Sequence, residues 1–350
     1  MNKATIDITQ WVRPNILRLK PYSSARSEFK GQADIFLDAN ENPFDTGMNR
    51  YPDPLQWAVK EELGKLKEIA PKHIFLGNGS DEVIDLLIRI FCEPGKDAIL
   101  TLPPTYGMYQ VSAGIADVAV REVPLTSDYQ PDVEGILAEA DQQTKLLFLC
   151  SPNNPTGNNL NLSEMEQLIA GFSGIVVVDE AYIDFSDQDS CISLLPQHPN
   201  LVVMQTFSKA WGLAGIRLGM AFASEEIIAL FNKVKPPYNV NQLTQKAALD
   251  ALLSDHSLTE MVEVILEQRE RLEQRLPDLP FVQKVYPSHA NFLLVKVDDP
   301  KRLYDYLVED KIIVRDRSNV LLCDGALRIT VGRPEENDQL LDSLIAYASY

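Results

Sequence analysis

Lys209 stands where the residue types of this sequence most clearly suggest chemistry. It follows a hydrophobic run at 201–204, the hydroxyl residues Thr206 and Ser208 come just before it, and Arg217 lies eight residues further on. A lysine amine can condense with an aldehyde, and hydroxyls together with a guanidinium can bind a phosphate. The pattern is typical of a lysine that holds a phosphorylated aldehyde. A solvated surface lysine is the alternative while Lys209 is considered alone.

Polar residues also follow two other hydrophobic runs. After 146–150 comes Ser-Pro-Asn-Asn-Pro-Thr-Gly, which contains Asn154, and after 175–178 comes Asp179. If these runs are parallel strands, their carboxyl ends open on one edge of the sheet, where α/β sheets bind ligands. A simple turn would also explain the first motif. Because a desolvated carboxylate needs a partner, Asp179 can bind a metal, cap a helix or pair with a cation.

Taken together, these residues supply what the cofactor pyridoxal phosphate requires. Its ring accepts electrons only while the ring nitrogen is protonated, a state that a buried carboxylate such as Asp179 can enforce. Asn154 can donate to the phenolic oxygen, and Lys209 can hold the aldehyde carbon. The candidate phosphate ligands are Thr206, Ser208 and Arg217. We therefore predict pyridoxal phosphate as the cofactor.

A glycine-rich segment offers a second contact for the phosphate. Gly-Asn-Gly-Ser-Asp-Glu at 77–82 opens a helical pattern at 80–92, so that Ser80 and Asp81 lie where backbone N–H groups can bind an anion. The segment lacks the Lys-Ser/Thr ending of a P-loop and the third glycine of a dinucleotide fingerprint, which argues against nucleotide binding. Tyr106 can stack on the cofactor ring, and a core tyrosine is the alternative.

The composition sets limits on the class of protein. The 350 residues predict two domains, and the formal net charge of −18 argues against non-specific binding of nucleic acid or anionic membranes. Any anion site must therefore be built locally. The four cysteines and four histidines are dispersed, which predicts no metal site. With no apolar signal core and no membrane-length apolar run, we expect a cytoplasmic protein.

Short apolar runs alternate with helical patterns in the middle of the chain. Continuous apolar strands between helices predict an α/β fold with a mainly parallel sheet sandwiched by helices. After residue 240 the pattern changes to one long charged helix at 242–276 and then to a smaller α+β domain. We predict an N-terminal arm at 1–30, a large cofactor-binding domain at 31–240 and a small domain at 241–350.

The order of the motifs resembles the aspartate-aminotransferase-like fold of pyridoxal phosphate enzymes. That order is Gly-Asn-Gly-Ser-Asp-Glu, Pro-Pro-Thr-Tyr, Ser-Pro-Asn-Asn-Pro-Thr-Gly, Asp-Glu-Ala-Tyr and then Ser-Lys with its later Arg. Within this fold, other segments are similar to the histidinol-phosphate aminotransferase family. They are Leu-Lys-Pro-Tyr (19–22), Leu-Asp-Ala-Asn-Glu-Asn-Pro (37–43), Asn-Arg-Tyr-Pro-Asp-Pro (49–54), Ser-His-Ala-Asn-Phe (288–292) and Leu-Arg-Ile-Thr-Val-Gly (327–332).

The resemblance implies an aminotransferase of histidine biosynthesis that acts on glutamate and histidinol phosphate as a homodimer with shared active sites. It implies that Tyr51 reaches the neighbour's cofactor phosphate and Tyr22 the neighbour's substrate. Asn40 is implied to bind substrate, and Tyr182 to bind cofactor. Arg328 is implied to bind the anionic end of the substrate, because a guanidinium fork suits both carboxylate and phosphate. A surface ion pair is the alternative for Arg328.

Other functions stay open at the level of sequence. An aromatic amino-acid aminotransferase or a threonine-phosphate decarboxylase shares most of these motifs. A cofactor-binding regulator without turnover is the alternative from another class, and the charge of −18 argues against its usual DNA-binding segment. Arg315 and Arg317 lie near Arg328 in sequence and are left without a role.

Overall fold

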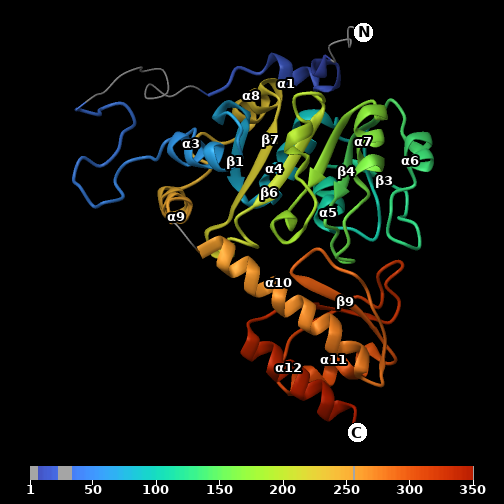
Figure 1. Ribbon diagram of the computed structural model, residues 1–350. Helices are drawn as coiled ribbons and strands as arrows, with labels where there is room; N and C mark the ends of the chain where they lie inside the picture. The colour runs from blue at the N-terminus through green and yellow to red at the C-terminus, as the bar shows by residue number, and fades with distance from the viewer. Residues whose placement is uncertain (1–6, 23–33, 255–256, 350) are drawn as a thin grey trace.

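The computed structural model describes residues 7–22, 34–254 and 257–349, and these form a large and a small domain (Figure 1). The larger sheet of the described residues has seven strands in the order β1-β7-β6-β5-β4-β2-β3. Its strands are β1 (Ile74–Asn78), β2 (Ala98–Thr101), β3 (Ala119–Glu122), β4 (Thr144–Cys150), β5 (Ile175–Asp179), β6 (Leu201–Thr206) and β7 (Leu218–Ala223). Strands β3, β2, β4, β5 and β6 are parallel, and β7 pairs antiparallel with both β6 and β1. The prediction of a mainly parallel α/β sheet is confirmed.

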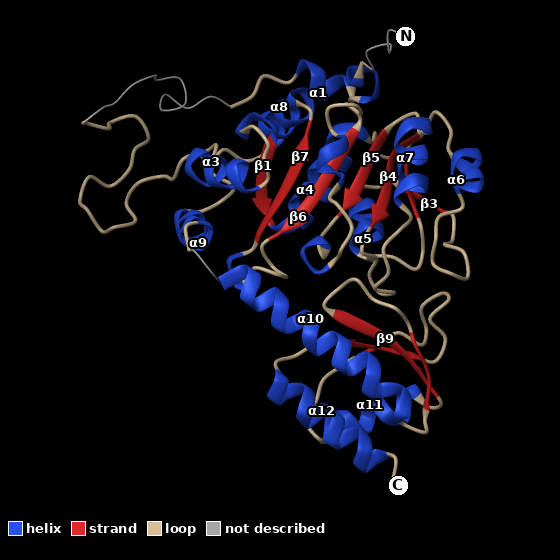
Figure 2. Cartoon of the chain, viewed as in Figure 1, coloured by secondary structure: helices blue, strands red, loops and turns tan. Residues whose placement is uncertain are grey.

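Helices cover both faces of this sheet (Figure 2). They are α1 (Pro14–Arg18), α3 (Trp57–Leu66), α4 (Gly79–Phe91), α5 (Met108–Ile115), α6 (Val133–Glu139), α7 (Leu162–Gly171), α8 (Glu225–Val234) and α9 (Gln242–Leu252). Short 3-10 helices connect several elements: η1 (Ile8–Trp11), η2 (Pro71–His73), η3 (Ile183–Phe185), η4 (Cys191–Leu194), η5 (Ala214–Ile216) and η6 (Leu276–Asp278). Within the predicted arm, η1 and α1 bury Ile8 and Ile16 against the large domain.

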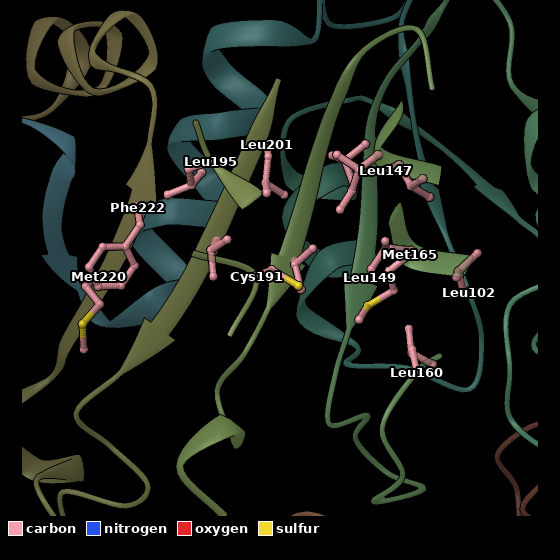
Figure 3. Close-up of a cluster of buried hydrophobic side chains, with 14 of the residues drawn as sticks. Leu102, Leu147, Leu149, Leu160, Met165, Cys191, Leu195, Leu201, Met220 and Phe222 are labelled. Atoms are coloured by element: carbon pink, nitrogen blue, oxygen red, sulfur yellow. The ribbon is translucent and has the colours of Figure 1, made fainter. Parts of the chain in front are cut away.

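The strands are apolar throughout because both faces of the sheet are buried. In β4, Leu147 and Leu149 belong to one hydrophobic cluster, whereas Leu146 and Phe148 belong to the cluster on the opposite face. Side chains alternate between faces along a strand, so continuous apolar runs are needed to fill both. Figure 3 shows part of the first cluster, with Leu149 next to Met165 and Leu147 further along the strand. Burying a leucine contributes about 2 kcal/mol, which makes this sheet a rigid platform for the site.

The small domain has a four-stranded antiparallel sheet in the order β10-β11-β9-β8, as far as the described residues go. Its elements are α10 (Ser257–Arg275), β8 (Val282–Val285), β9 (Phe292–Val297), α11 (Pro300–Glu309), β10 (Arg315–Asp316), β11 (Ala326–Thr330) and α12 (Pro334–Tyr347). Helices α10, α11 and α12 pack against the sheet around a core of their own. In Figure 1, α10 leads from the large domain along the small one.

The prediction of one long helix at 242–276 is wrong. The chain forms two helices there, α9 and α10, and 255–256 lie outside the described residues. Residues 253–256 between them read Leu-Ser-Asp-His. Serine and aspartate side chains compete with helix hydrogen bonds, so they favour helix ends over helix interiors.

The structure also bears on membrane-spanning helices and on the cysteines. Of the helices in the described part of the chain, none combines the length and the apolar character needed to cross a bilayer. All four cysteines are buried free thiols.

Candidate active site

One edge of the large sheet gathers the residues singled out in the sequence. Asn154 follows β4, Asp179 ends β5 and Lys209 follows β6, so all three lie at the carboxyl ends of parallel strands. Because β7 runs the opposite way, Arg217, which precedes it, lies at the same edge. The carboxyl end of β1 brings the start of α4 there too.

These side chains line a single pocket of about 780 Å³ between the sheet edge and the small domain. Eleven of the predicted site residues line it: Ser80, Asp81, Tyr106, Asn154, Asp179, Tyr182, Thr206, Ser208, Lys209, Arg217 and Arg328. The topology therefore brings together residues that are distant in sequence. Tyr22, Asn40 and Tyr51 do not line this pocket.

Asp179 is a buried carboxylate with one donor on each oxygen. The hydroxyl of Tyr109 donates to Oδ2 at 2.6 Å, and the backbone N–H of Ala181 donates to Oδ1 at 3.1 Å. Burial raises the pKa of Asp179 to about 6, while the two donors act in the opposite direction. A carboxylate that is this costly to ionise gains most from a cationic partner in the pocket.

Lys209 is accessible from the pocket and lies beside the ring of Tyr182, with Nζ 5.5 Å from the ring centroid. Partial burial and then the positive charge of Arg328 lower the pKa of the Lys209 amine, and the charge of Asp179 opposes this. A lysine with a lowered pKa has more neutral amine at neutral pH. It is therefore a better nucleophile and a better general base than a surface lysine.

Asn154, Tyr182 and Arg328 form a hydrogen-bonded group that joins the two domains. Nη1 of Arg328 donates to the side-chain oxygen of Asn154 at 2.5 Å, and the Asn154 amide donates to the Tyr182 hydroxyl at 3.3 Å. The Arg328 guanidinium also lies 5.2 Å from the ring centre of Phe292. These contacts fix the arginine of the small domain over the pocket of the large domain.

The start of α4 is open to an anion. A Cβ on Gly79, where φ is +71°, would lie 2.8 Å from Nη2 of Arg217, and a Cβ on Gly219 would lie 2.2 Å from the backbone N of Ser80. Only glycines at these positions let the helix start approach the sheet edge and the guanidinium. The first-turn N–H groups and Arg217 therefore face the same space, which is an anion-binding arrangement.

Asp81 places a negative charge at the start of α4, where an anion would bind. Its Oδ2 lies 3.5 Å from Nη2 of Arg217, and its Oδ1 accepts from the Tyr106 hydroxyl at 3.2 Å. A carboxylate repels a phosphate, so the group that Asp81 offers an anion is its backbone N–H in the first turn of α4. Near it, Thr206 and Ser208 supply hydroxyls, and the Ser208 N–H donates to Oγ1 of Thr206 at 3.1 Å.

The donor set suits a phosphorylated pyridine. The pocket offers an anion site, an amine, an amide donor and a buried carboxylate, which are the partners of a phosphate, an aldehyde, a phenolic oxygen and a ring nitrogen. Nε of Arg328 is buried without a partner. That unused donor leaves the guanidinium edge free for a further anionic group.

Tyr51, Asn40 and Tyr22 lie outside this pocket. Tyr51 is half exposed and stacks on Tyr238 with ring centres 4.4 Å apart. Asn40 lines a second, smaller pocket with Tyr51, and Tyr22 is exposed. Because they do not line the pocket of their own chain, the roles predicted for Tyr22 and Tyr51 need a neighbouring subunit.

Sequence reasoning left Arg315 and Arg317 without a role, and the structure places both in the pocket. Arg315 is the direct cross-strand partner of Arg328 in the antiparallel β10–β11 pair. Nε of Arg317 is buried without a partner, and the charges of Arg328 and Arg315 add to burial in lowering the pKa of Arg317. The sequence held a signal for this placement: Arg315 and Arg317 are two residues apart, and residues two apart in a strand share a face.

Sequence reasoning also missed Tyr109, which holds Asp179. It lies three residues after Tyr106, and the two rings meet edge to face with centres 5.6 Å apart. Nothing in the local sequence indicates that Tyr109 points toward the end of β5.

The fold and the pocket define an α/β enzyme with an amine and a buried carboxylate at the strand ends and guanidinium groups at two sides. The model of the family described as aminotransferase class I and II matches residues 36–344. The chain belongs to this family. The resemblance predicted from the motifs is confirmed.

Individual relatives agree with this assignment. A histidinol-phosphate aminotransferase of Cytophaga hutchinsonii is 57% identical over 340 residues, which cover 96% of this chain and 98% of the relative. The crystal structure of the histidinol-phosphate aminotransferase from Clostridium acetobutylicum superposes with a TM-score of 0.80 at 25% identity, covering 87% of this chain and 92% of the other. That from Sinorhizobium meliloti, in complex with pyridoxal-5'-phosphate, gives 0.79 at 25% identity, covering 86% and 83%.

Proposed function

We propose that this chain is a pyridoxal-phosphate-dependent histidinol-phosphate aminotransferase. It transfers an amino group between L-glutamate and imidazole acetol phosphate, and yields 2-oxoglutarate and L-histidinol phosphate for histidine biosynthesis. The observation that carries the substrate assignment is the cluster of Arg315, Arg317 and Arg328 in the pocket. No carboxylate forms an ion pair with these arginines within the described residues. Three adjacent guanidiniums suit a phosphate dianion better than a single carboxylate.

In this proposal the residues at the sheet edge hold the cofactor. Asp179 pairs with the ring nitrogen, Asn154 and Tyr182 donate to the ring oxygen, and Tyr106 contacts the ring face. Lys209 holds the aldehyde carbon. The phosphate contacts the first turn of α4 at Ser80 and Asp81, together with Thr206, Ser208 and Arg217. The openness of the α4 start at Gly79 supports this arrangement.

Pyridoxal phosphate, when bound, supplies a ring that accepts electron density from the α-carbon of an amino substrate. Lys209 supplies the proton transfer. Its Nζ takes the proton from the substrate α-carbon, which its lowered pKa favours, and would deliver that proton to the former aldehyde carbon of the bound cofactor. Arg328 orients the substrate from the opposite side, because its guanidinium is fixed by Asn154.

We also propose that the enzyme is a homodimer with shared active sites. A loop before residue 50 extends away from the body of the chain (Figure 1), and in it Leu37 is 89% and Phe44 76% exposed. Such apolar side chains favour a protein partner. In the dimer, Tyr51 reaches the partner's cofactor phosphate and Tyr22 reaches the partner's substrate, and Asn40 binds substrate.

We also propose an arm at 1–30, a large cofactor-binding domain at 31–240 and a small domain at 241–350, whose first helix, α9, packs against the large domain through Ala248. We further propose that the enzyme works in the cytoplasm. The four buried thiols support this location, because reduced cysteines are typical of a reducing compartment.

A substrate panel tests the proposed function. The purified chain, supplied with pyridoxal phosphate and 2-oxoglutarate, is offered histidinol phosphate, phenylalanine or threonine phosphate. We expect kcat/KM for histidinol phosphate to exceed that for phenylalanine by at least about tenfold, and no release of carbon dioxide from threonine phosphate. Preferred turnover of phenylalanine, or decarboxylation of threonine phosphate, would overturn the proposal.

A further inference from the structure

Tyr109 reaches Asp179 from outside the sheet. It lies on α5, is fully buried, and donates its hydroxyl proton to Oδ2 of Asp179 at 2.6 Å. Its ring stacks on Phe148 of β4 with centres 4.5 Å apart and planes 16° from parallel. The stack holds the ring with its hydroxyl at the Asp179 carboxylate, and the thiol of Cys150 lies beside the same hydroxyl.

Two donors fix Asp179 from different elements. The N–H of Ala181 follows β5 in the same chain segment and donates to Oδ1, whereas Tyr109 comes from α5 and donates to Oδ2. With one donor on each oxygen the carboxylate cannot rotate without losing both bonds. Asp179 still lines the pocket, so it has acceptor capacity left for a ligand.

The same hydroxyl favours the ionised form of Asp179. Burial alone favours the protonated acid, and Asp81 on α4 adds to this effect, whereas Tyr109, Ala181 and Lys209 oppose it. The thiol of Cys150 on β4 and the hydroxyl of Tyr182 are further buried titratable groups that interact with Asp179. Burial and the charge of Asp179 raise the pKa of Tyr109 well above its usual value, so Tyr109 keeps its proton as a permanent donor.

We propose that Tyr109 is a positioning residue that keeps Asp179 ionised and aimed at a cationic ring nitrogen in the pocket. The inference rests on the proposed function, because it assigns Asp179 to the cofactor ring. It adds Tyr109 as the residue that keeps the buried Asp179 carboxylate able to pair with the ring nitrogen. A merely structural role for Tyr109 would affect stability but not the ionisation of Asp179.

The test compares the wild-type chain with Tyr109→Phe, which keeps the ring and the stack on Phe148. In the cofactor-free protein, ¹³C NMR of labelled aspartate follows the titration of the Asp179 carboxyl. The dissociation constant of pyridoxal phosphate is measured on the same samples at pH 7.5. Tyr129→Phe is the matched control, because it removes another buried tyrosine hydroxyl, which donates to Leu322 O at 2.8 Å.

We expect Tyr109→Phe to raise the pKa of Asp179 by about one unit and to weaken cofactor binding about tenfold, as expected for a lost hydrogen bond to a charged group. The Tyr129→Phe control should leave both values unchanged. An Asp179 titration identical in Tyr109→Phe and wild type would overturn the inference.

Two further measurements distinguish a failure of the proposed function from a failure of the inference about Tyr109. If Asp179→Asn binds the cofactor as tightly as wild type, the assignment of Asp179 under the proposed function fails, whatever Tyr109 does to the carboxyl. If Tyr109→Phe does not fold, wild-type chain containing fluorotyrosine replaces it. Its more acidic hydroxyl is a stronger donor and should lower the pKa of Asp179, and an unchanged pKa would contradict the inference.

Discussion

Arg315 lies directly opposite Arg328 in the antiparallel register of β10 and β11. Two like charges facing each other across a strand pair destabilise the pair. Within the described residues no carboxylate relieves them, and Arg317 adds a third guanidinium to the same pocket. The protein tolerates this arrangement at the edge of a small sheet, which indicates that an anionic ligand balances the charge during function.

The three arginines predict how substrates respond to Arg317→Met. We expect KM for histidinol phosphate to rise by about 10- to 100-fold, as for one lost charge-assisted hydrogen bond, with a smaller change for glutamate, whose carboxylate carries less charge. Steady-state kinetics with both substrates measure the ratio. Arg89→Met, which removes an exposed arginine paired with Asp85, is the control and should change neither KM. Equal effects of Arg317→Met on both substrates would contradict a phosphate role.

The buried carboxylate predicts an unusual pH dependence for the cofactor-free protein. The pKa of Asp179 is raised to about 6, above the value of about 3.9 expected in the unfolded chain. Its favourable contribution to stability is complete below about pH 4 and is lost as the pH rises through 6. Asp179→Asn should therefore stabilise the cofactor-free protein relative to wild type by about 3 kcal/mol at pH 8 and by nearly nothing at pH 4.

Urea denaturation of both proteins at the two pH values measures this difference. The same substitution should weaken cofactor binding, so stability and function change in opposite directions. A difference between the two proteins that stays constant from pH 4 to pH 8 would show that Asp179 does not titrate in this range.

Truncating a buried side chain in the sheet that carries the site should lower the stability of the protein strongly. Leu149 is fully buried on β4, one residue before Cys150 at the pocket. Leu149→Ala should lower the free energy of unfolding by about 2–5 kcal/mol. Leu66→Ala, at a half-exposed position, is the control and should cost less than about 1 kcal/mol. Chemical denaturation measures both, and equal losses would contradict the assignment of Leu149 to the core.

Shared active sites predict complementation between subunits. A Lys209→Ala chain and a Tyr51→Ala chain should each be nearly inactive as homodimers. In a mixed dimer, one site combines an intact Lys209 with the Tyr51 of the partner subunit, so the mixture should regain activity. Turnover of refolded mixtures is measured against each variant alone. If mixing restores nothing although mixed dimers form, Tyr51 acts within its own subunit or not at all.

The sequence was sufficient for the main features of the fold because these depend on local patterns. The runs that became β4, β5 and β6 are apolar on both faces, which identifies them as central strands. The grouping of Asn154, Asp179 and Lys209 in one site follows from that assignment, since the carboxyl ends of parallel strands meet at one edge of the sheet. The break between α9 and α10 was missed, because the charged helical pattern continues through both helices.

The parts of the site that the sequence did not predict depend on contacts between distant segments. Tyr109 lies on a helix and contacts Asp179 seventy residues later, so only the packing of α5 on β4 reveals its partner. The pairing of Arg315 with Arg328 depends on the register of β10 and β11, which short strands leave undetermined in the sequence.

The central claim is that Lys209 supports transamination of histidinol phosphate in this pocket. A single-turnover experiment tests it most directly, in which cofactor-loaded protein is mixed with histidinol phosphate and the visible absorbance of the cofactor is followed together with the formation of imidazole acetol phosphate. Wild-type protein should form one equivalent of this product per site, and Lys209→Ala should form it at least about 10³-fold more slowly. Product formation by Lys209→Ala at the wild-type rate, or none by wild type, would contradict the claim.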